Sequence, residues 1–369
     1  MRIYSYFILR KGLKPKYYLF CIPVLAFLLW SPQTLLADTQ TLERIAEAER
    51  EVNYVGIRLK TFISPRGTRT FEERVIHKSP DIFYGKELSV VGERKPFGGS
   101  HGNERRDERH RDNRRSDRDE NRRNGREREH EHHKWHQVRS LLSKKNVELI
   151  AQNYTLEKSP FTEDIANYEA DLLTITPKFA GRATHRLFFA RENGVILRLE
   201  ALDDEGVLRA MFVYTRISFD PEIVERKWET FQKEIKLEPQ RSHSISLADG
   251  EKILKTKPIQ PEYLPPGFQL QDVHSIKDKE NTIHLIYTDG LLGFSIFETT
   301  DKRARRSRDR RRGSDVIELD GTSVHKYQRG STHAFSWSSA DIHFFLFGAM
   351  PASEMQKVVE SMIYKTKKK

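Results

Sequence analysis

Short stretches in which apolar and polar residues alternate recur along the chain, and pairs of turn-forming residues separate them. Residues 184–190 and 195–201 flank an Asn-Gly pair at 193–194, and an Asp-Gly pair at 289–290 divides another such segment. Asn-Gly and Asp-Gly favour tight hairpins because these residues tolerate a positive φ. Consecutive hairpins predict an α+β fold that is mostly antiparallel β.

The alternation also predicts which side of a strand is buried. Residues 53–63 place aliphatic side chains on one face and Arg58 on the other. Residues 184–190, 195–201 and 207–215 predict three consecutive strands. The middle strand has three apolar residues on one face: Val195, Leu197 and Leu199. Arg198 and Glu200 lie on the opposite face. We therefore expect one side of this sheet to be buried and the other to face water.

Four stretches have apolar residues at helical spacing. Three are residues 41–52, 221–235 and 351–364, and the fourth follows Trp135, with Val138, Leu141, Leu142 and Val147 on its apolar side. Pro221 suits the first turn of a helix, because the missing N–H of proline costs nothing there. This helix has an apolar stripe made of Ile223, Val224, Trp228, Phe231 and Ile235. Residues 147–156, by contrast, predict a strand.

Residues 98–134 are nearly free of apolar side chains and cannot form a core. Residues 102–134 hold 12 Lys/Arg against 10 Asp/Glu (12 − 10 = +2). These opposite charges largely neutralise one another, which argues against strong nucleic-acid binding. Three histidines in this stretch could bind a metal loosely: His130, His132 and His133. Their spacing is not that of a metal site, so a disordered, solvated insertion is the interpretation we adopt.

The N-terminus predicts an export signal. Basic residues precede an apolar run at 19–30, and Ala37 ends a plausible cleavage site, so residues 1–37 form the expected signal peptide. The alternative is an uncleaved inner-membrane anchor, because residues 17–37 approach the length of a membrane span. Pro23 and the polar residues after Trp30 favour cleavage.

The single cysteine, Cys21, lies inside this segment. Cleavage would leave a chain without cysteine, which excludes disulfides, thiolate metal sites and a cysteine nucleophile. No phosphate-binding glycine loop and no HExxH helix occurs in the sequence. We therefore expect no catalytic residue, no metal site and no cofactor, and a protein that works by binding.

The excess of positive charge is local. The whole chain has a net charge of +11, and residues 301–312 hold eight basic and two acidic residues (8 − 2 = +6). Export removes nucleic acid as a partner, so an anionic lipid or an acidic protein is expected. A phosphate-bearing lipid is the candidate ligand of seven arginines: Arg303, Arg305, Arg306, Arg308, Arg310, Arg311 and Arg312. The alternative is a solvated loop that keeps the protein soluble.

These patterns divide the mature chain into two domains. The first is expected at residues 38–235, with the insertion 98–134 inside it. A polar segment without periodicity, residues 236–260, is interpreted as a linker. Residues 261–365 form the second domain.

Eight short motifs follow one another in an order typical of a single protein family. Four lie in the first domain, at 175–182 (ITPKFAGR), 186–189 (RLFF), 192–198 (ENGVILR) and 212–215 (FVYT). Four lie in the second, at 263–268 (YLPPGF), 284–291 (HLIYTDGL), 294–298 (FSIFE) and 355–361 (MQKVVES). Together they resemble the RseB/MucB family of periplasmic sigma-E regulatory proteins, over the mature chain apart from the insertion.

The resemblance implies a LolA-like open half-barrel with helices on its concave face, followed by a small α+β domain. It also implies a periplasmic, non-catalytic envelope-stress regulator that binds the periplasmic part of an anti-sigma factor and is released by lipid or lipopolysaccharide. An unclosed sheet offers an apolar concavity suited to the acyl chains of lipid A or a lipoprotein. The insertion and the arginine run are not features expected of the family.

Two other functions remain open at this point. The chain could be a LolA-type carrier of lipoprotein or lipid, or a structural protein of the envelope that binds polyanions through its arginines. The second domain favours the regulator, because a carrier needs only the half-barrel. A homo-oligomer is compatible with the sequence.

Overall fold

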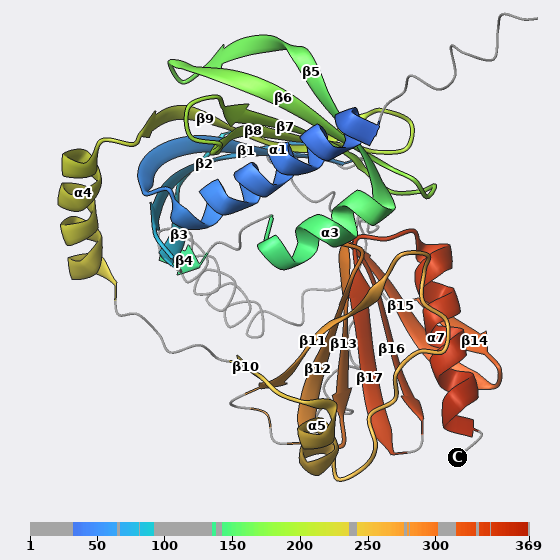
Figure 1. The fold of residues 1–369 in the computed structure, drawn as a ribbon. Coiled ribbons are helices and arrows are strands. Elements are labelled where there is room, and N and C mark those ends of the chain that lie inside the picture. The colour runs from blue at the N-terminus through green and yellow to red at the C-terminus, as the bar shows by residue number, and fades with distance from the viewer. Residues whose placement is uncertain are drawn as a thin grey trace, which may run out of the picture.

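The chain folds into two antiparallel β-sheets, each with helices packed against it, in a computed structural model (Figure 1). The structure describes residues 32–64, 67–80, 82–91, 135–137, 142–235, 242–276, 279, 281–301, 315–329, 332–339 and 341–367. The insertion 98–134 and most of the expected signal peptide lie outside these residues. Both therefore stay predictions.

Nine antiparallel strands form the first sheet, in the spatial order β4-β3-β2-β1-β9-β8-β7-β6-β5. Within the described residues the edge strands β4 and β5 have one neighbour each, so the sheet curves without closing into a barrel. This confirms the expected open, mostly antiparallel fold. The strands are β1 (Tyr54–Ser64), β2 (Gly67–Lys78), β3 (Ile82–Val91), β4 (Trp135–Gln137), β5 (Tyr154–Ile165), β6 (Tyr168–Pro177), β7 (Thr184–Ala190), β8 (Ile196–Leu202) and β9 (Leu208–Ser218).

Two helices, α1 (Pro32–Glu51) and α3 (Lys144–Asn153), lie inside the curve of this sheet (Figure 1). Leu42 and Ile45 of α1, one helical turn apart, are fully buried. They pack with Ile150 of α3 against apolar residues of β5 to β8. The expected helices-on-concave-face arrangement is therefore present, and burial of each such side chain stabilises the fold by roughly 1.5–3 kcal/mol.

The outer face of β7 and β8 is buried as well, because the far end of the β5–β6 hairpin folds back over it. Ile165 and Ala170 of that hairpin pack on Phe188 and Leu197. The register between β7 and β8 shifts at Phe188/Phe189, and this bulge turns Leu197 away from the concave side. The prediction that Val195, Leu197 and Leu199 share one buried face opposite a wet one is therefore wrong.

The helix α4 (Pro221–Glu234) packs on the outer face of β1 and β2, as its apolar stripe predicts. Trp228 and Phe231 lie against Ile76 of β2. The carboxylate of Asp220 accepts hydrogen bonds from two backbone N–H groups in the first turn, which caps the helix.

Eight antiparallel strands form the second sheet, in the order β10-β11-β12-β13-β17-β16-β15-β14. Helices α5 (Leu247–Leu254) and α7 (Ala352–Lys367) pack on one face of it. The strands are β10 (Ser242–Ser244), β11 (Gln269–Ile276), β12 (Thr282–Thr288), β13 (Gly293–Thr299), β14 (Asp315–Leu319), β15 (Thr322–Arg329), β16 (Thr332–Ser339) and β17 (Ile342–Gly348).

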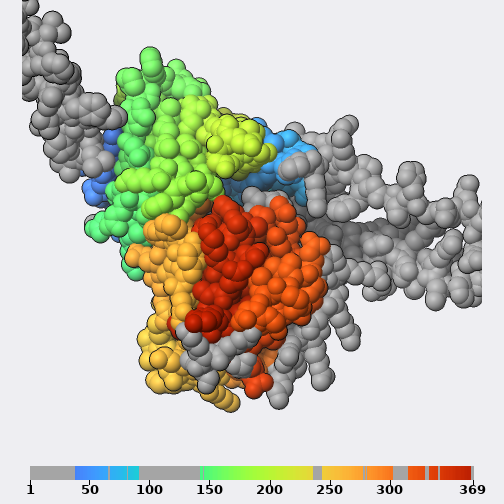
Figure 2. All heavy atoms as spheres, turned by 90° about the vertical axis from the view of Figure 1, so that its right-hand side faces the viewer, coloured from blue at the N-terminus to red at the C-terminus, as the bar shows by residue number. Residues whose placement is uncertain are grey.

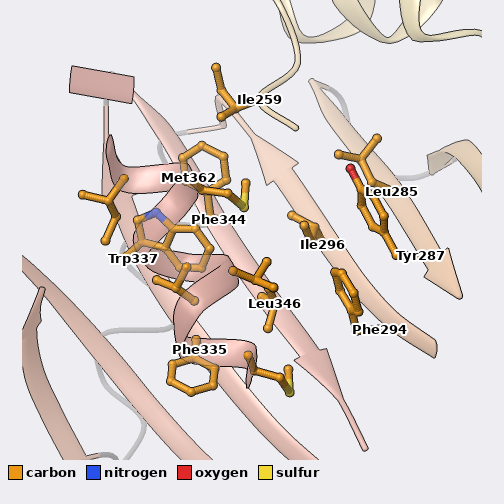
Figure 3. Packing of buried hydrophobic residues seen from close by; sticks show 14 of the residues in the cluster. Ile259, Leu285, Tyr287, Phe294, Ile296, Phe335, Trp337, Phe344, Leu346 and Met362 are labelled. Carbon is orange, nitrogen blue, oxygen red and sulfur yellow. The ribbon is translucent and has the colours of Figure 1, made fainter. Parts of the chain in front are cut away.

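The core of this second unit is aromatic and continuous (Figure 3). Trp337 stacks on Phe344 at 5.0 Å, and Tyr287 stacks on Phe294 at 4.9 Å. Met362 of α7 closes the core from the helix side. We call residues 32–235 the first unit and residues 242–367 the second unit.

Two local expectations differ from the structure. Residues 236–260, interpreted as a plain linker, contain β10 and α5, and Leu254 is buried in the second core. Residues 147–156 are the end of α3 and the start of β5 instead of one strand. Val147 and Ile150 satisfy a helical as well as an alternating pattern, so periodicity could not decide between them.

In the part of the chain that the structure describes, every helix is too short or too polar to cross a bilayer.

Candidate functional site

Three apolar side chains extend the concave face of the first sheet beyond α1. Phe71 lies opposite both Lys60 of β1 and Val90 of β3, which places all three on the side that α1 occupies. Phe62 follows on the same side of β1, with its ring 6.2 Å from that of Phe71. Phe62 is 51% exposed and Val90 is 40% exposed. We call Phe62, Phe71 and Val90 the apolar rim.

Next to the rim, the concave face holds buried charge. Arg58 Nε donates to Glu73 Oε2 at 2.7 Å, and Lys60 Nζ donates to Glu73 Oε1 at 2.7 Å. Glu73 is fully buried. The guanidinium of Arg58 lies 4.8 Å from the ring of Phe212 and 5.6 Å from that of Phe83. Aromatic faces stabilise a cation that has lost its water, so this pair tolerates burial.

The same surroundings affect the tyrosines on this face. Burial raises the pKa of Tyr214 to about 12. Burial also raises the pKa of Tyr54 well above its ordinary value. Both phenols are therefore neutral at physiological pH and can only act as hydrogen-bonding groups and aromatic contacts.

A second polar centre joins the two units, and three side chains of the first unit donate to Asp289 in it. Arg182 Nη1 donates to Asp289 Oδ2 at 2.8 Å, and the Tyr154 hydroxyl donates to the same oxygen at 2.7 Å. Asn153 Nδ2 donates to the Asp289 carbonyl at 2.9 Å and to the Gly267 carbonyl at 3.0 Å. Asp289 comes from the second unit, and the three donors come from the first.

Backbone geometry makes this contact close. Gly290 has φ +108°, and a Cβ there would lie 2.7 Å from Ile150 Cγ1. Gly267 has φ +78° and lies directly against Asn153. Only glycine permits both the conformation and the approach. We call the contact set around Asp289, Arg182, Tyr154 and Asn153 the joint. Figure 2 shows the two units in contact with each other.

A shallow pocket of about 310 Å³ opens beside the joint. The β6–β7 connection contributes Lys178, Phe179 and Arg182 to its lining, and Asp203 and Asp204 also line it. The lining thus contains both cationic and anionic side chains, which gives the pocket no preference for ligands of one charge.

The seven arginines predicted to bind phosphate, from Arg303 to Arg312, lie outside the described residues. Their role stays a prediction. Among the residues that the structure describes, no group of three His, Cys, Asp or Glu side chains is placed to hold a metal ion.

Comparison with known proteins identifies the first unit. Residues 121–232 match the family model of the MucB/RseB N-terminal domain, which extends from before β4 into α4. This part of the chain is a MucB/RseB N-terminal domain. The resemblance inferred from the sequence motifs is therefore confirmed. Residues 258–362 match a domain of unknown function (DUF4367).

A curated relative is the sigma-E factor regulatory protein RseB of Haemophilus influenzae. It is 26% identical over 160 residues, which are 41% of this chain and 46% of that protein, so the match spans about half of the relative. MucB in the Pseudomonas aeruginosa MucA/MucB complex is 17% identical with a TM-score of 0.45, covering 88% of this chain and 98% of that one. A putative outer membrane lipoprotein-sorting protein domain from Vibrio parahaemolyticus is 10% identical with a TM-score of 0.19, covering 51% and 100%.

Sequence patterns missed both polar centres. Asp289-Gly290 was interpreted as a hairpin turn, and it is one, since Asp289 Oδ1 accepts from the backbone N–H of Leu292 at 2.8 Å. Its other carboxylate oxygen makes the joint. Arg58 was assigned to the outer side of a half-buried strand, yet it is only 6% exposed. The burial of Arg58 could have been predicted from Glu73, an opposite charge that lies directly across the β1–β2 hairpin from it.

Replacing Glu73 by Gln should lower the free energy of unfolding by about 3–5 kcal/mol, because Arg58 and Lys60 would keep buried positive charge without a counterion. Urea unfolding measures this loss. Glu72→Gln, one residue away on the other face, is the matched control and should change stability by less than about 0.5 kcal/mol. Adding Arg58→Met to Glu73→Gln should recover part of the loss. Equal stability of the two single variants would contradict this account of the pair.

Acidification should weaken the fold through His185, which is buried beside the joint. Burial lowers the pKa of His185 below its ordinary 6.5, although the nearby charge of Asp289 opposes this. Below pH 6.5 the unfolded chain therefore binds a proton that the folded chain does not, so stability falls as pH drops, by at most about 1.4 kcal/mol per pH unit. Urea unfolding at pH 7.5 and 5.5 should show a smaller difference for His185→Gln than for the unmodified chain. The exposed His243→Gln should leave the difference unchanged.

Proposed function

We propose that this protein is a non-catalytic periplasmic regulator of the envelope stress response, which binds the periplasmic part of an anti-sigma factor. The MucB/RseB domain at residues 121–232 is the observation that carries the proposal. The name of the curated relative, a sigma-E factor regulatory protein, supports it. Binding without covalent chemistry agrees with the sequence, in which no catalytic motif was found.

The apolar rim is the surface we assign to partner binding. Phe62 and Val90 are large apolar side chains exposed side by side with Phe71 on a concave face. Such grouped exposure on a soluble surface marks contact sites for other molecules. The rim residues lie on the paired strands β1, β2 and β3, so little ordering is needed when a partner docks.

We further propose that lipid or lipopolysaccharide releases the partner. The acyl chains would compete for the apolar rim, and the seven arginines from Arg303 to Arg312 would bind the phosphates of the head group. A LolA-type carrier receives less support, because α1 and α3 already fill the concave side of β5 to β8. Acyl chains could enter there only if both helices moved.

The partner proposal is tested by capture of the periplasmic segment of an anti-sigma factor from the same organism. The unmodified chain should bind it, and Phe62→Ser should weaken binding at least about tenfold, as expected for loss of a buried aromatic anchor. Phe161→Ser is the matched control, since Phe161 is 79% exposed on the edge strand β5, and should bind normally. Failure of the unmodified chain to capture any anti-sigma segment would refute the function, and equal binding by both variants would refute the rim.

The lipid proposal is tested with vesicles that contain lipopolysaccharide. Replacing all seven arginines by serine should weaken vesicle binding and flatten its dependence on salt, because screened charge interactions would be lost. Co-sedimentation over a range of NaCl concentrations measures both quantities. An unchanged affinity at low salt would show that the arginines are only a solvated loop.

A further inference from the structure

The two units have separate hydrophobic cores. The core of the second unit contains residues of that unit alone, and the buried residues in the cores of the first unit all lie between Leu42 and Phe231. Among the described residues, Leu291 of the second unit, which is partly buried, packs against the main core of the first. The two sets of cores otherwise share no residue of the described part of the chain.

Polar contacts hold the units together instead. The side chains of Arg182 and Asp289 are 3% and 0% exposed, and both are charged residues. Arg182 also donates to the Pro266 carbonyl and lies over the ring of Phe268 at 5.1 Å. At the edge of the contact, Gln271 donates to Asn146 at 2.9 Å. The contacts across the boundary thus include hydrogen bonds, an ion pair and a cation over a ring, beside the close packing of Gly290 on Ile150 and of Gly181 on Pro351.

Because its contacts lie between two separate cores, the joint differs from an ion pair that is buried inside one core. When a core opens, its charges and its apolar residues all become exposed together, which costs the whole stability of the domain. When the joint opens, Arg182 and Asp289 exchange their mutual bonds for bonds to water, and each core stays intact. The net gain from each bond in the closed state is small, because water replaces it in the open state.

We propose that the joint is a releasable contact. It holds the two units in one relative position while Asp289 accepts hydrogen bonds from Arg182 and Tyr154, and it lets the units separate as intact bodies when these bonds are broken. A single carboxylate thus controls the arrangement of the whole chain. The affinity of a partner that binds both units would depend on this arrangement. That consequence rests on the proposed function, whereas the proposal about the joint does not.

The joint is tested by the distance between spin labels placed on the full chain, at Lys227→Cys on α4 and Glu360→Cys on α7, with Cys21→Ser as background. Both sites are exposed on helices of different units. The unmodified joint should give one narrow distance distribution. Asp289→Asn should raise the fraction of molecules at longer distances about tenfold or more, because a charge-assisted pair is lost.

Asp171→Asn is the matched control. Asp171 is also a buried carboxylate that accepts from an arginine, at 3.0 Å and 2.7 Å from Arg191, but the pair lies inside the first unit. This variant should be less stable while keeping the narrow distribution. Tyr154→Phe is the milder variant, because it removes one hydroxyl from Asp289 and keeps the ring in the core. It should broaden the distribution to a smaller extent.

The outcomes decide the proposal without any partner present. Longer distances in Asp289→Asn and Tyr154→Phe, with a narrow distribution in Asp171→Asn, support a releasable joint. A narrow distribution in both joint variants would overturn it, and so would a loss of folding in both, since the joint would then be part of one continuous core. Failure to capture an anti-sigma factor would not change either result.

Discussion

A wide sheet that does not close has an apolar concave face, and the fold of the first unit follows from the need to cover it. Nine strands curve around α1 and α3, whose buried residues fill the space over β5 to β8. The outer face meets the same requirement, since the β5–β6 hairpin covers one part and α4 covers another. Among the described residues, the end of the concave face at Phe62 and Val90 stays exposed beside the half-buried Phe71, which is why a binding surface is assigned there.

Buried charge occurs in this fold where aromatic rings and opposite charges replace water. Arg58 is held between Glu73 and the rings of Phe212 and Phe83. Arg182 has the same kind of surroundings, with Asp289 as its counterion and Phe268 under its guanidinium. Arginine suits both places because its planar group stacks on rings while it donates hydrogen bonds in the plane. The first pair fixes one sheet internally, and the second connects two units.

Local features of the fold were predictable from the sequence. The hairpin at Asn193-Gly194 and the helix after Pro221 depend on residues that are neighbours in the chain, and both form as expected. The bulge at Leu197 depends on the β5–β6 hairpin packing over it, and the burial of Arg58 depends on Phe212 from a distant strand. Alternation along one strand carries no information about such partners. The rim and the joint were unpredictable for the same reason.

The motifs that revealed the family also show how one short sequence serves two purposes. Asp289-Gly290 makes the β12–β13 turn through one carboxylate oxygen and the joint through the other. The loop that contains Gly267 and the ITPKFAGR segment that ends in Arg182 supply the opposite sides of the same contact. A turn alone would accept Asn in place of Asp, and a loop alone would accept many residues. The requirement for this carboxylate, these glycines and this arginine together comes from the contact between the units.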